Sequence, residues 1–308
     1  MSTSTGTTTP AQQPILLLTR HRQLAPAAAI RTLNQVGATD ILDRFYNLGG
    51  NFIDTDRGQP EKWLGDWMTA RKIHDEIVLS CSYGNAWRPH GNSKLQSNFG
   101  GNNAKSMKVA LKASLTNLQT TYVDIFYVAW WNHTTSIPEL MHGLNDLVAA
   151  GKVLYLGIVD TPAWIVAKAN EYARQKGLRQ FAVYGGLSTC ESRGIECDIV
   201  PMCADEGMAI CALPRSTYFV PTEKQRTMPA HQHGSDLEVA LKKVGKPKVA
   251  SNAAQVDVAY VRAKAPYVFV VITLTTVADV ESMLAALDVV LSEQDIQVIE
   301  SSYKFAFG

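Results

Sequence analysis

The chain has 308 residues, of which 46% are hydrophobic and 19% charged, and its formal net charge is +1. So small a charge creates no long-range field for nucleic acid, and the sequence lacks the roughly 18-residue apolar run of a membrane span, so we expect neither partner. Its five cysteines show no Cys-x-x-Cys spacing. That usage favours reduced thiols and a cytoplasmic location over a disulfide framework.

The first segment of the chain, residues 1–14, reads MSTSTGTTTPAQQP and is rich in Ser and Thr. It has neither the basic nor the apolar region of a secretory signal. We expect it to be a disordered tail, and residues 15–308 to form one domain.

Short apolar runs then alternate with longer amphipathic ones. Seven runs that are apolar on both faces indicate buried parallel strands, at 50–55, 76–83, 123–130, 152–160, 180–185, 208–214 and 267–273. The amphipathic runs predict helices at 38–50, 60–72, 103–119, 136–151, 161–177, 251–265 and 277–291. Ser136 and Glu139 have the spacing of a capping box at the start of one of these helices.

This alternation over the length of the chain predicts an α/β fold, a (β/α)8 TIM barrel. An open Rossmann sheet is less favoured because no Gly-x-Gly-x-x-Gly turn follows the first strand. Only a few residues, 34–37, separate the run AIRTL from the first helix. We therefore expect the first β/α unit to be shortened or open.

A barrel of this kind carries its functional groups where its strands end. Strict alternation along the strands places Asp54 on the same face as Phe52, and Ser82 on the same face as Ser80 but opposite to Cys81. The candidate site residues are those at or just after the ends of the predicted strands: Asp54, Ser82, Tyr83, Ala129, Trp130, Trp131, Asn132, His133, Asp160, Tyr184 and Arg215.

Several stretches resemble the aldo-keto reductase superfamily, in its fungal aryl-alcohol dehydrogenase and norsolorinic acid reductase-like branch. They include GGNFIDT, EKWLGDWM, TTYVDIFYV, SIPELMHGLNDLVAAGKVLYLGI, DTPAWIVAKANEYARQKGLRQFAVY and DIVPMCADEGM. The resemblance covers about residues 15–308. It implies a (β/α)8 barrel, NADPH, and carbonyl reduction by an Asp/Tyr/Lys/His tetrad.

The tetrad matches at only one of its four positions. Asp54 stands at the family aspartate, but the segment DTDRGQPEKWLG is short and contains no tyrosine. Ser82 stands at the family lysine and Ala129 at the family histidine. Losing a general acid costs roughly 10²–10⁴-fold in rate. On this pattern we expect the family redox chemistry to be lost.

The cofactor positions implied by the resemblance also differ. Val159 replaces a serine, although Asp160 remains, and Gly185 replaces the glutamine that holds the carboxamide. Residues 273–276 read TLTT where relatives carry a basic Gly-Gly-Arg-Lys turn, and Met283 replaces an asparagine. Charge-assisted bonds to phosphate are among the strongest available. We therefore expect no cofactor, with NADPH binding weak or absent.

Three functions remain open at this point. We favour a cofactor-independent cyclase, isomerase or dehydratase of fungal secondary metabolism, acting on an aromatic or polyene, polyketide-like substrate by positioning. The second is a residual NADPH-dependent carbonyl or aryl-alcohol oxidoreductase, with a rearranged donor such as Tyr83. The third is a non-catalytic binding or scaffold protein.

Each candidate residue has two interpretations. Asp54 is a general acid or base, or else it pairs with Arg57 or Arg215 or bonds to Ser82. Arg215 binds an enolate or carboxylate, or is a surface arginine.

The residues at and just after the end of the predicted strand 123–130 also have two interpretations each. His133 is a proton shuttle or a solvated loop histidine. One of Trp130 and Trp131 lines the substrate pocket as a flat apolar wall, and the other belongs to the core. His231 and His233 have a metal-ligand spacing but no acidic or cysteine neighbour, so we expect no metal.

Overall fold

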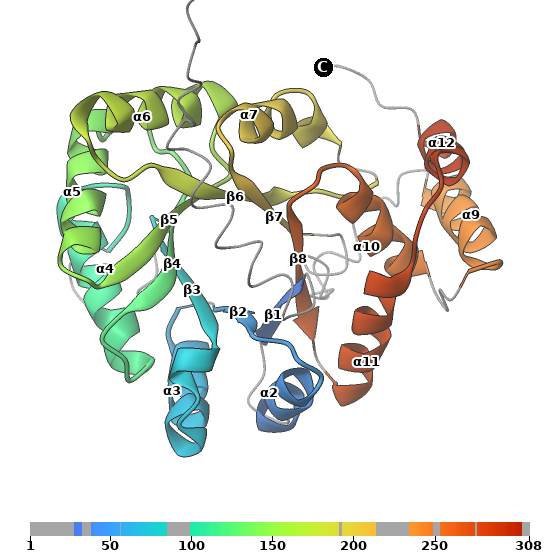
Figure 1. The fold of residues 1–308 in the computed structure, drawn as a ribbon, viewed down its shortest axis with the longest axis horizontal. Coiled ribbons are helices and arrows are strands. Elements are labelled where there is room, and N and C mark those ends of the chain that lie inside the picture. Colours follow the sequence, from blue (N-terminus) through green and yellow to red (C-terminus); the bar gives the residue numbers. More distant parts are fainter. Residues whose placement is uncertain are drawn as a thin grey trace, which may run out of the picture.

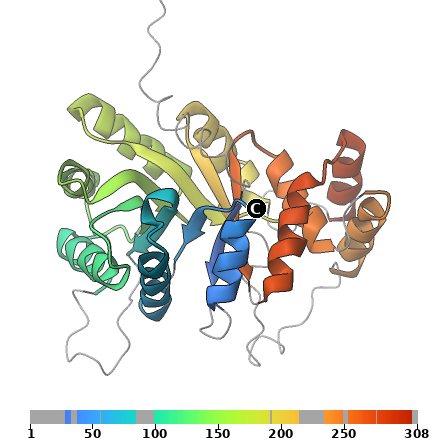
Figure 2. The ribbon, with the colours of Figure 1, turned by 60° about the horizontal axis from the view of Figure 1, so that its bottom comes forward.

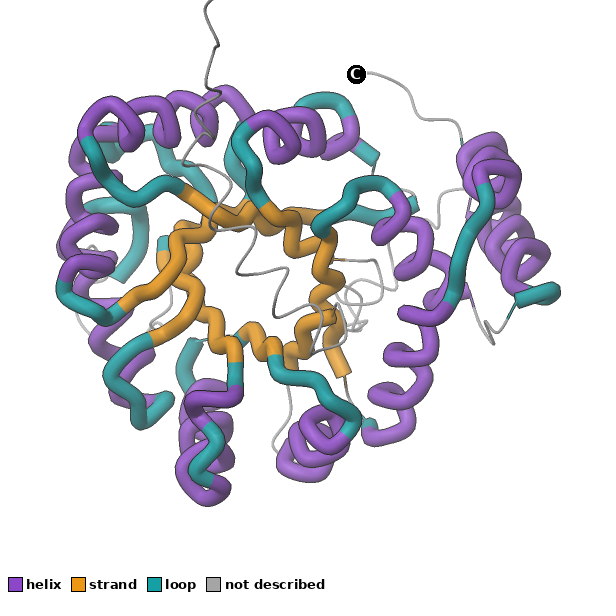
Figure 3. Tube along the Cα trace, viewed as in Figure 1, coloured by secondary structure: helices purple, strands orange, loops and turns teal. Residues whose placement is uncertain are grey.

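Eight parallel strands form a closed barrel in which each strand pairs with its neighbours in chain order, and β1 also pairs with β8. This computed structural model describes residues 28–32, 38–55, 57–84, 99–190, 193–213, 234–248, 253–274 and 276–303. Figure 3 shows the ring of strands with the helices outside it. The strands are β1 (Ala28–Thr32), β2 (Phe52–Asp54), β3 (Val78–Tyr83), β4 (Val123–Ala129), β5 (Val153–Val159), β6 (Phe181–Leu187), β7 (Ala209–Leu213) and β8 (Val268–Leu274).

Helices follow the strands around the outside of the ring (Figure 1). They are α2 (Ala38–Asn47), α3 (Gln59–Arg71), α4 (Ala104–Asn117), α5 (Ile137–Ala149), α6 (Ala163–Lys176), α7 (Ile199–Asp205), α9 (Gly234–Gly245), α10 (Ala253–Ala263), α11 (Val277–Ala285) and α12 (Glu293–Ser302). Helices α9 and α12 lie side by side beyond α10, farther from the barrel axis than the other helices (Figures 1 and 2). They form an addition to the barrel's single layer of helices.

The predicted TIM barrel is confirmed, and all seven predicted strands are present. The first unit is short, because β1 ends at Thr32 and α2 begins at Ala38. It is nevertheless closed, since β1 is paired on both sides. Three helices were not predicted: α7, α9 and α12. The last predicted helix stops early, because a 3-10 turn at Ala286–Asp288 follows α11.

Local signals explain where the helices begin. Ser136 caps α5, its hydroxyl accepting a hydrogen bond from the Glu139 amide at 3.3 Å. Glu139 does not return the bond of a capping box in this structure. Its carboxylate instead accepts from the Ala104 amide at the start of α4, at 3.5 Å. The cap on α5 thus also joins it to the neighbouring helix.

The hydrophobic core has two layers, because alternate residues of each strand face opposite sides of the sheet. The inner layer fills the barrel and includes Phe52, Ile125, Tyr127, Val183 and Phe269. The outer layer lies between strands and helices and contains most of the buried apolar side chains. The barrel is therefore a packed core rather than a pore.

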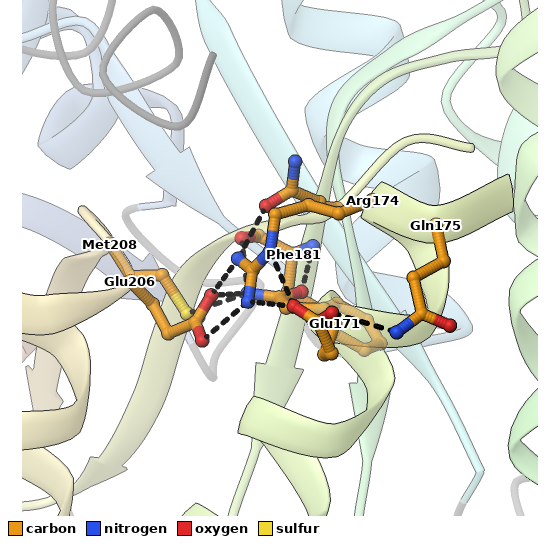
Figure 4. Close-up of polar contacts among 8 residues, drawn as sticks. Glu171, Arg174, Gln175, Phe181, Glu206 and Met208 are labelled. Carbon is orange, nitrogen blue, oxygen red and sulfur yellow. Dashed lines mark hydrogen bonds and ion pairs between the residues drawn. The ribbon is translucent and has the colours of Figure 1, made fainter. Parts of the chain in front are cut away.

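A polar cluster ties α6 to the segment between α7 and β7 (Figure 4). Arg174 on α6 donates two hydrogen bonds to the buried Glu206 carboxylate, at 2.6 and 3.1 Å. Asn170, one turn earlier, donates to the same carboxylate at 3.1 Å and accepts from the Phe181 amide at 2.8 Å. These bonds fix the start of β6 relative to both helices.

All five cysteines are free thiols, as their spacing predicted. No helix among the described residues is long and apolar enough to cross a membrane.

The cluster around Arg174 gives a stability prediction with an internal control. The Glu206 side chain is 6% exposed, whereas that of Glu171, which also contacts Arg174, is 54% exposed. Glu206→Gln removes a desolvated, bidentate ionic bond, so we expect the free energy of unfolding to fall by about 1–3 kcal/mol. Glu171→Gln should lower it by less than about 0.5 kcal/mol. Urea denaturation measures both, and equal losses would contradict this ranking.

Candidate functional site

The carboxyl-terminal ends of the parallel strands meet at one face of the barrel, which we call the mouth. Its floor includes the last inward-facing residues of β2 to β5, which are Asp54, Ser82, Ala129 and Val159, and Gly185 on the inner face of β6. Their inward direction follows from their alternation with inner-layer residues such as Phe52, Val78 and Tyr127.

Asp54 faces the barrel interior, as alternation predicted. The residue is 7% exposed, and its Oδ1 accepts a hydrogen bond from the Ser80 hydroxyl at 2.6 Å. The sequence had suggested Ser82, Arg57 or Arg215 as its partner, whereas this bond comes from the serine two residues before Ser82. The bond orients a desolvated carboxylate at the mouth, which is the environment of a general acid or base.

Arg57 faces the outer layer. Desolvation lowers the pKa of Arg57, and the nearby charges of Cys81 and Glu61 oppose that shift. Glu61 is fully buried and accepts hydrogen bonds from the Gly58 amide at 3.1 Å and the Asn117 side chain at 2.9 Å. The turn between β2 and α3 is therefore folded tightly onto the helix layer.

Below Ala129, the inner face of β4 carries a second polar group. The Tyr127 hydroxyl donates to the Cys211 thiol on β7, at 3.1 Å. Gly157 on β5 makes room for the tyrosine, because a Cβ there would lie 2.3 Å from the ring. Burial raises the pKa of Cys211 to about 12, so its thiol stays protonated at neutral pH.

The two tryptophans after β4 go to different places. Trp130 has a left-handed backbone, with φ of 63°, and is 65% exposed at the rim of the mouth. Trp131 is 6% exposed and packs in the outer layer of the core. Continued alternation after Ala129 would have pointed the Trp131 side chain into the barrel. The left-handed backbone of Trp130 breaks this alternation. Of these two tryptophans, Trp131 is therefore the core residue and Trp130 is the one that is accessible to a ligand.

His133 lies in the loop that follows β4. The residue is exposed, and its Nδ1 accepts a hydrogen bond from the Trp131 indole at 3.2 Å. This placement fits the solvated loop histidine rather than a proton shuttle. Asn132 is part of the same loop, where its side chain accepts from the Thr134 amide at 3.1 Å.

Tyr83 and Tyr184, two other predicted site residues, face the helices. Tyr83 is 1% exposed, stacks on Phe126, and donates to the Asn102 carbonyl at 3.3 Å. Burial raises the pKa of Tyr83 well above its ordinary value. Tyr184 lies in the outer layer and donates to the Thr161 carbonyl at 3.0 Å. Neither hydroxyl points into the mouth, so Tyr83 does not fit the role of a rearranged proton donor.

Asp160 stands at the rim next to Trp130. Its backbone is also left-handed, with φ of 47°, and its amide donates to the Gly185 carbonyl at 3.1 Å. Desolvation raises the pKa of Asp160. The residue nevertheless stays accessible to solvent.

Asn102 is a residue of the site that the sequence did not single out. It is fully buried, and its side-chain amide bonds to the backbone of residues 130 and 132. Its neighbour Asn103 caps α4, accepting from the Ser106 amide at 2.9 Å. The segment GGNN was therefore recognisable in the sequence as the start of a helix. The contact of Asn102 with the segment after β4 depends on tertiary structure, so the sequence alone does not reveal it.

Arg215, His231 and His233 lie outside the described residues. Within the part of the chain that the structure describes, no three His, Cys, Asp or Glu side chains group as metal ligands.

One described group at the mouth fits the nicotinamide end of the NADPH that the resemblance implies. Asp160 offers carboxylate acceptors to the N–H groups of a carboxamide, and it remains accessible. The resemblance puts the phosphate-binding turn at residues 273–276, of which Thr275 lies outside the described residues. Thr276 and Asp279 cap α11 with reciprocal bonds of 2.8 and 3.2 Å. The fit therefore rests on the donor and acceptor chemistry around Asp160.

Comparison with known proteins identifies the family. Residues 25–304 match the model of the aldo/keto reductase family. The chain is 41% identical to norsolorinic acid reductase B of Dothistroma septosporum, over 94% of this chain and 82% of that protein. It is 42% identical to norsolorinic acid reductase B of Aspergillus parasiticus, over 95% and 86%. It is 35% identical to aryl-alcohol dehydrogenase [NADP(+)] of Phanerodontia chrysosporium, over 97% and 90%. The chain therefore belongs to the aldo/keto reductase family.

This membership overturns the function favoured from the sequence. The family and its named relatives are reductases and dehydrogenases, which indicates an enzyme of the oxidoreductase type. The expectation of lost redox chemistry, with a cyclase, isomerase or dehydratase in its place, was wrong. The expectation rested on Ser82 and Ala129 at positions that the resemblance assigns to the tetrad, and it does not outweigh a match over nearly the whole chain.

The expectation that no cofactor is used is corrected by the same findings. The matched family is one of reductases, and one relative carries NADP(+) in its name. The findings therefore point to NADPH as the cofactor.

Gly84, at the end of β3, gives a prediction about the geometry of the mouth. Its φ is 120°, and a Cβ there would lie 2.1 Å from the Ala129 carbonyl oxygen. Because that contact is with backbone, Gly84→Ala should lower the free energy of unfolding by more than about 2 kcal/mol.

Gly151 is the matched control, since its φ is 68° and a Cβ there would have nothing within 4 Å. Gly151→Ala should cost about 1 kcal/mol, from the backbone conformation alone. Similar values for both variants in urea denaturation would show that β3 and β4 do not approach this closely.

Proposed function

We propose that this member of the aldo/keto reductase family is an NADP(H)-dependent oxidoreductase that interconverts a small aromatic carbonyl compound and its alcohol. The observation that carries the proposal is Asp54, a desolvated carboxyl held at the inner mouth of a closed barrel by the Ser80 hydroxyl. The names of the relatives, norsolorinic acid reductase and aryl-alcohol dehydrogenase [NADP(+)], support both the reaction type and the aromatic substrate class.

In this proposal, the chemistry that NADPH would supply when bound is hydride donation to the carbonyl carbon. Asp54 would take part in the accompanying proton transfer, as general acid toward the carbonyl oxygen in reduction and as general base in the reverse reaction. The Ser80 hydroxyl fixes the direction of that carboxyl group, which orients it for the transfer.

Two residues at the rim complete the proposed site. Asp160 would accept hydrogen bonds from the carboxamide of the cofactor. Trp130 offers an exposed indole face, 65% accessible, against which a flat aromatic ring can stack. Ser82, on the inner face between Asp54 and Ala129, adds a hydroxyl that can donate to or accept from the substrate oxygen.

The test uses NADPH and a panel of aromatic aldehydes. We expect NADPH fluorescence to change saturably on titration with the protein, and absorbance of NADPH to fall only when an aldehyde is present. Asp54→Asn should lower kcat/KM by roughly 10²–10⁴-fold, because the amide cannot transfer the proton.

Asp146→Asn is the matched control, since Asp146 is an exposed residue in the last turn of α5, at the end of the helix that leads to the start of β5 rather than to the mouth. It should leave kcat/KM unchanged. Failure of the natural protein to bind NADPH would overturn the proposed function. Turnover that Asp54→Asn leaves intact would remove Asp54 from the mechanism while keeping the reaction.

A further inference from the structure

Asn102 makes an unusual set of contacts for a residue that lies just before a helix. Its side-chain Nδ2 donates to the Trp130 carbonyl at 3.0 Å, and its Oδ1 accepts from the Asn132 amide at 2.9 Å. One amide group thus bonds to the backbone on both sides of Trp131. The residue is fully buried, so both bonds are shielded from competing water.

These bonds hold a backbone conformation that is otherwise unfavourable. A bulky residue such as Trp130 is rarely left-handed, and such a conformation costs about 1–3 kcal/mol. Trp130 also leaves most of a large apolar side chain in water. Strained residues of this kind persist where the surroundings over-determine them, and they concentrate at ligand sites.

The residues around Asn102 pack closely and hold it in position for these two bonds. The Tyr83 hydroxyl donates to the Asn102 carbonyl at 3.3 Å, and the Gly101 amide donates to the Gly84 carbonyl at 2.7 Å. Added Cβ atoms would lie 3.2 Å from the Asn102 Nδ2 at Gly84 and 2.8 Å from the Asn132 Nδ2 at Gly101. The ends of β3 and β4 and the segment before α4 therefore approach so closely that only glycine fits at two places.

The constrained loop borders the proposed substrate position. The Trp130 amide continues the β4–β5 ladder, donating to the Val159 carbonyl at 3.1 Å. Trp130 therefore stands beside Asp160, and both have left-handed backbones at the rim. Asn102 holds the peptide group that directly follows Trp130, and through it the backbone from which the indole projects.

We infer that Asn102 is a positioning residue for substrate recognition, fixing the Trp130 indole at the rim as a preformed wall for a flat aromatic ligand. The inference rests on the proposed function for the identity of the reaction, and on the geometry of residues 101–103 and 130–132 for the role of Asn102. Asn102 does not touch the reacting atoms, so it acts on substrate affinity rather than on the chemical step.

The test compares Asn102→Ala with Asn170→Ala. Asn170 is a matched control because it is also fully buried and its amide also bonds to a backbone N–H and C=O, those of Phe181 at the start of β6. Asn170 also donates to the Glu206 carboxylate, so we expect Asn170→Ala to lose at least as much stability as Asn102→Ala. Only Asn102→Ala should raise KM for an aromatic aldehyde, by about tenfold, with kcat and the NADPH dissociation constant within twofold of the natural protein.

A double-mutant cycle with Trp130→Ala then tests whether Asn102 acts through the indole. If it does, Trp130→Ala alone should raise KM at least as much as Asn102→Ala, and the double variant should add nothing further. Additive effects on KM, or equal KM values for the Asn102→Ala and Asn170→Ala proteins, would overturn the inference.

The same comparison remains decisive if no turnover is found. Binding of benzaldehyde, followed by quenching of tryptophan fluorescence, replaces KM in every arm of the experiment. Weaker binding in Asn102→Ala alone would support the positioning role even though the proposed reaction had failed. Absence of any aromatic binding to the natural protein would overturn the role itself.

Discussion

Closure of the parallel sheet is the constraint on which the rest of this structure depends. Because β1 pairs with both β2 and β8, every strand has two faces with fixed destinations, one toward the barrel interior and one toward the helices. The closure also brings the ends of all strands to one face. Asp54 on β2 and Asp160 after β5 reach the same mouth for this reason, although more than a hundred residues separate them.

Because alternate residues of each strand face opposite sides of the sheet, the positions of some site residues could be predicted from the sequence. Asp54 was placed correctly from its alternation with Phe52, and the same rule applied to β3 would have placed Tyr83 with Cys81, facing the helices. The position of Trp131 does not follow from this alternation. Its place in the outer layer depends on the left-handed conformation of Trp130, which nothing in the local sequence signals and which Asn102 stabilises from a distant segment. Helices α9 and α12 were missed because they pack outside the barrel's repeating units.

The function was harder to read than the fold, for a different physical reason. A few residues at the strand ends, Ser82 and Ala129 among them, suggested lost redox chemistry because they differ from the family tetrad. The similarity over almost the entire chain points instead to an oxidoreductase. Side chains at a site act together with the backbone and with the neighbouring residues whose hydrogen bonds orient them. The bond from Ser80 to Asp54 and the bond between Asn102 and the Asn132 amide are examples. The identities of individual residues are therefore an incomplete guide to chemistry.

The most direct test of the proposed oxidoreductase is the transfer of an isotope label from the cofactor to the substrate. The natural protein is incubated with an aromatic aldehyde and NADPH deuterated at C4 of the nicotinamide, using a separate sample for each face of the ring, and the product is analysed by mass spectrometry. We expect one of the two samples to give an alcohol carrying a single deuterium on the former carbonyl carbon. An unlabelled alcohol, or no alcohol from either sample at protein concentrations that exceed those of the aldehyde, would contradict hydride transfer by this chain.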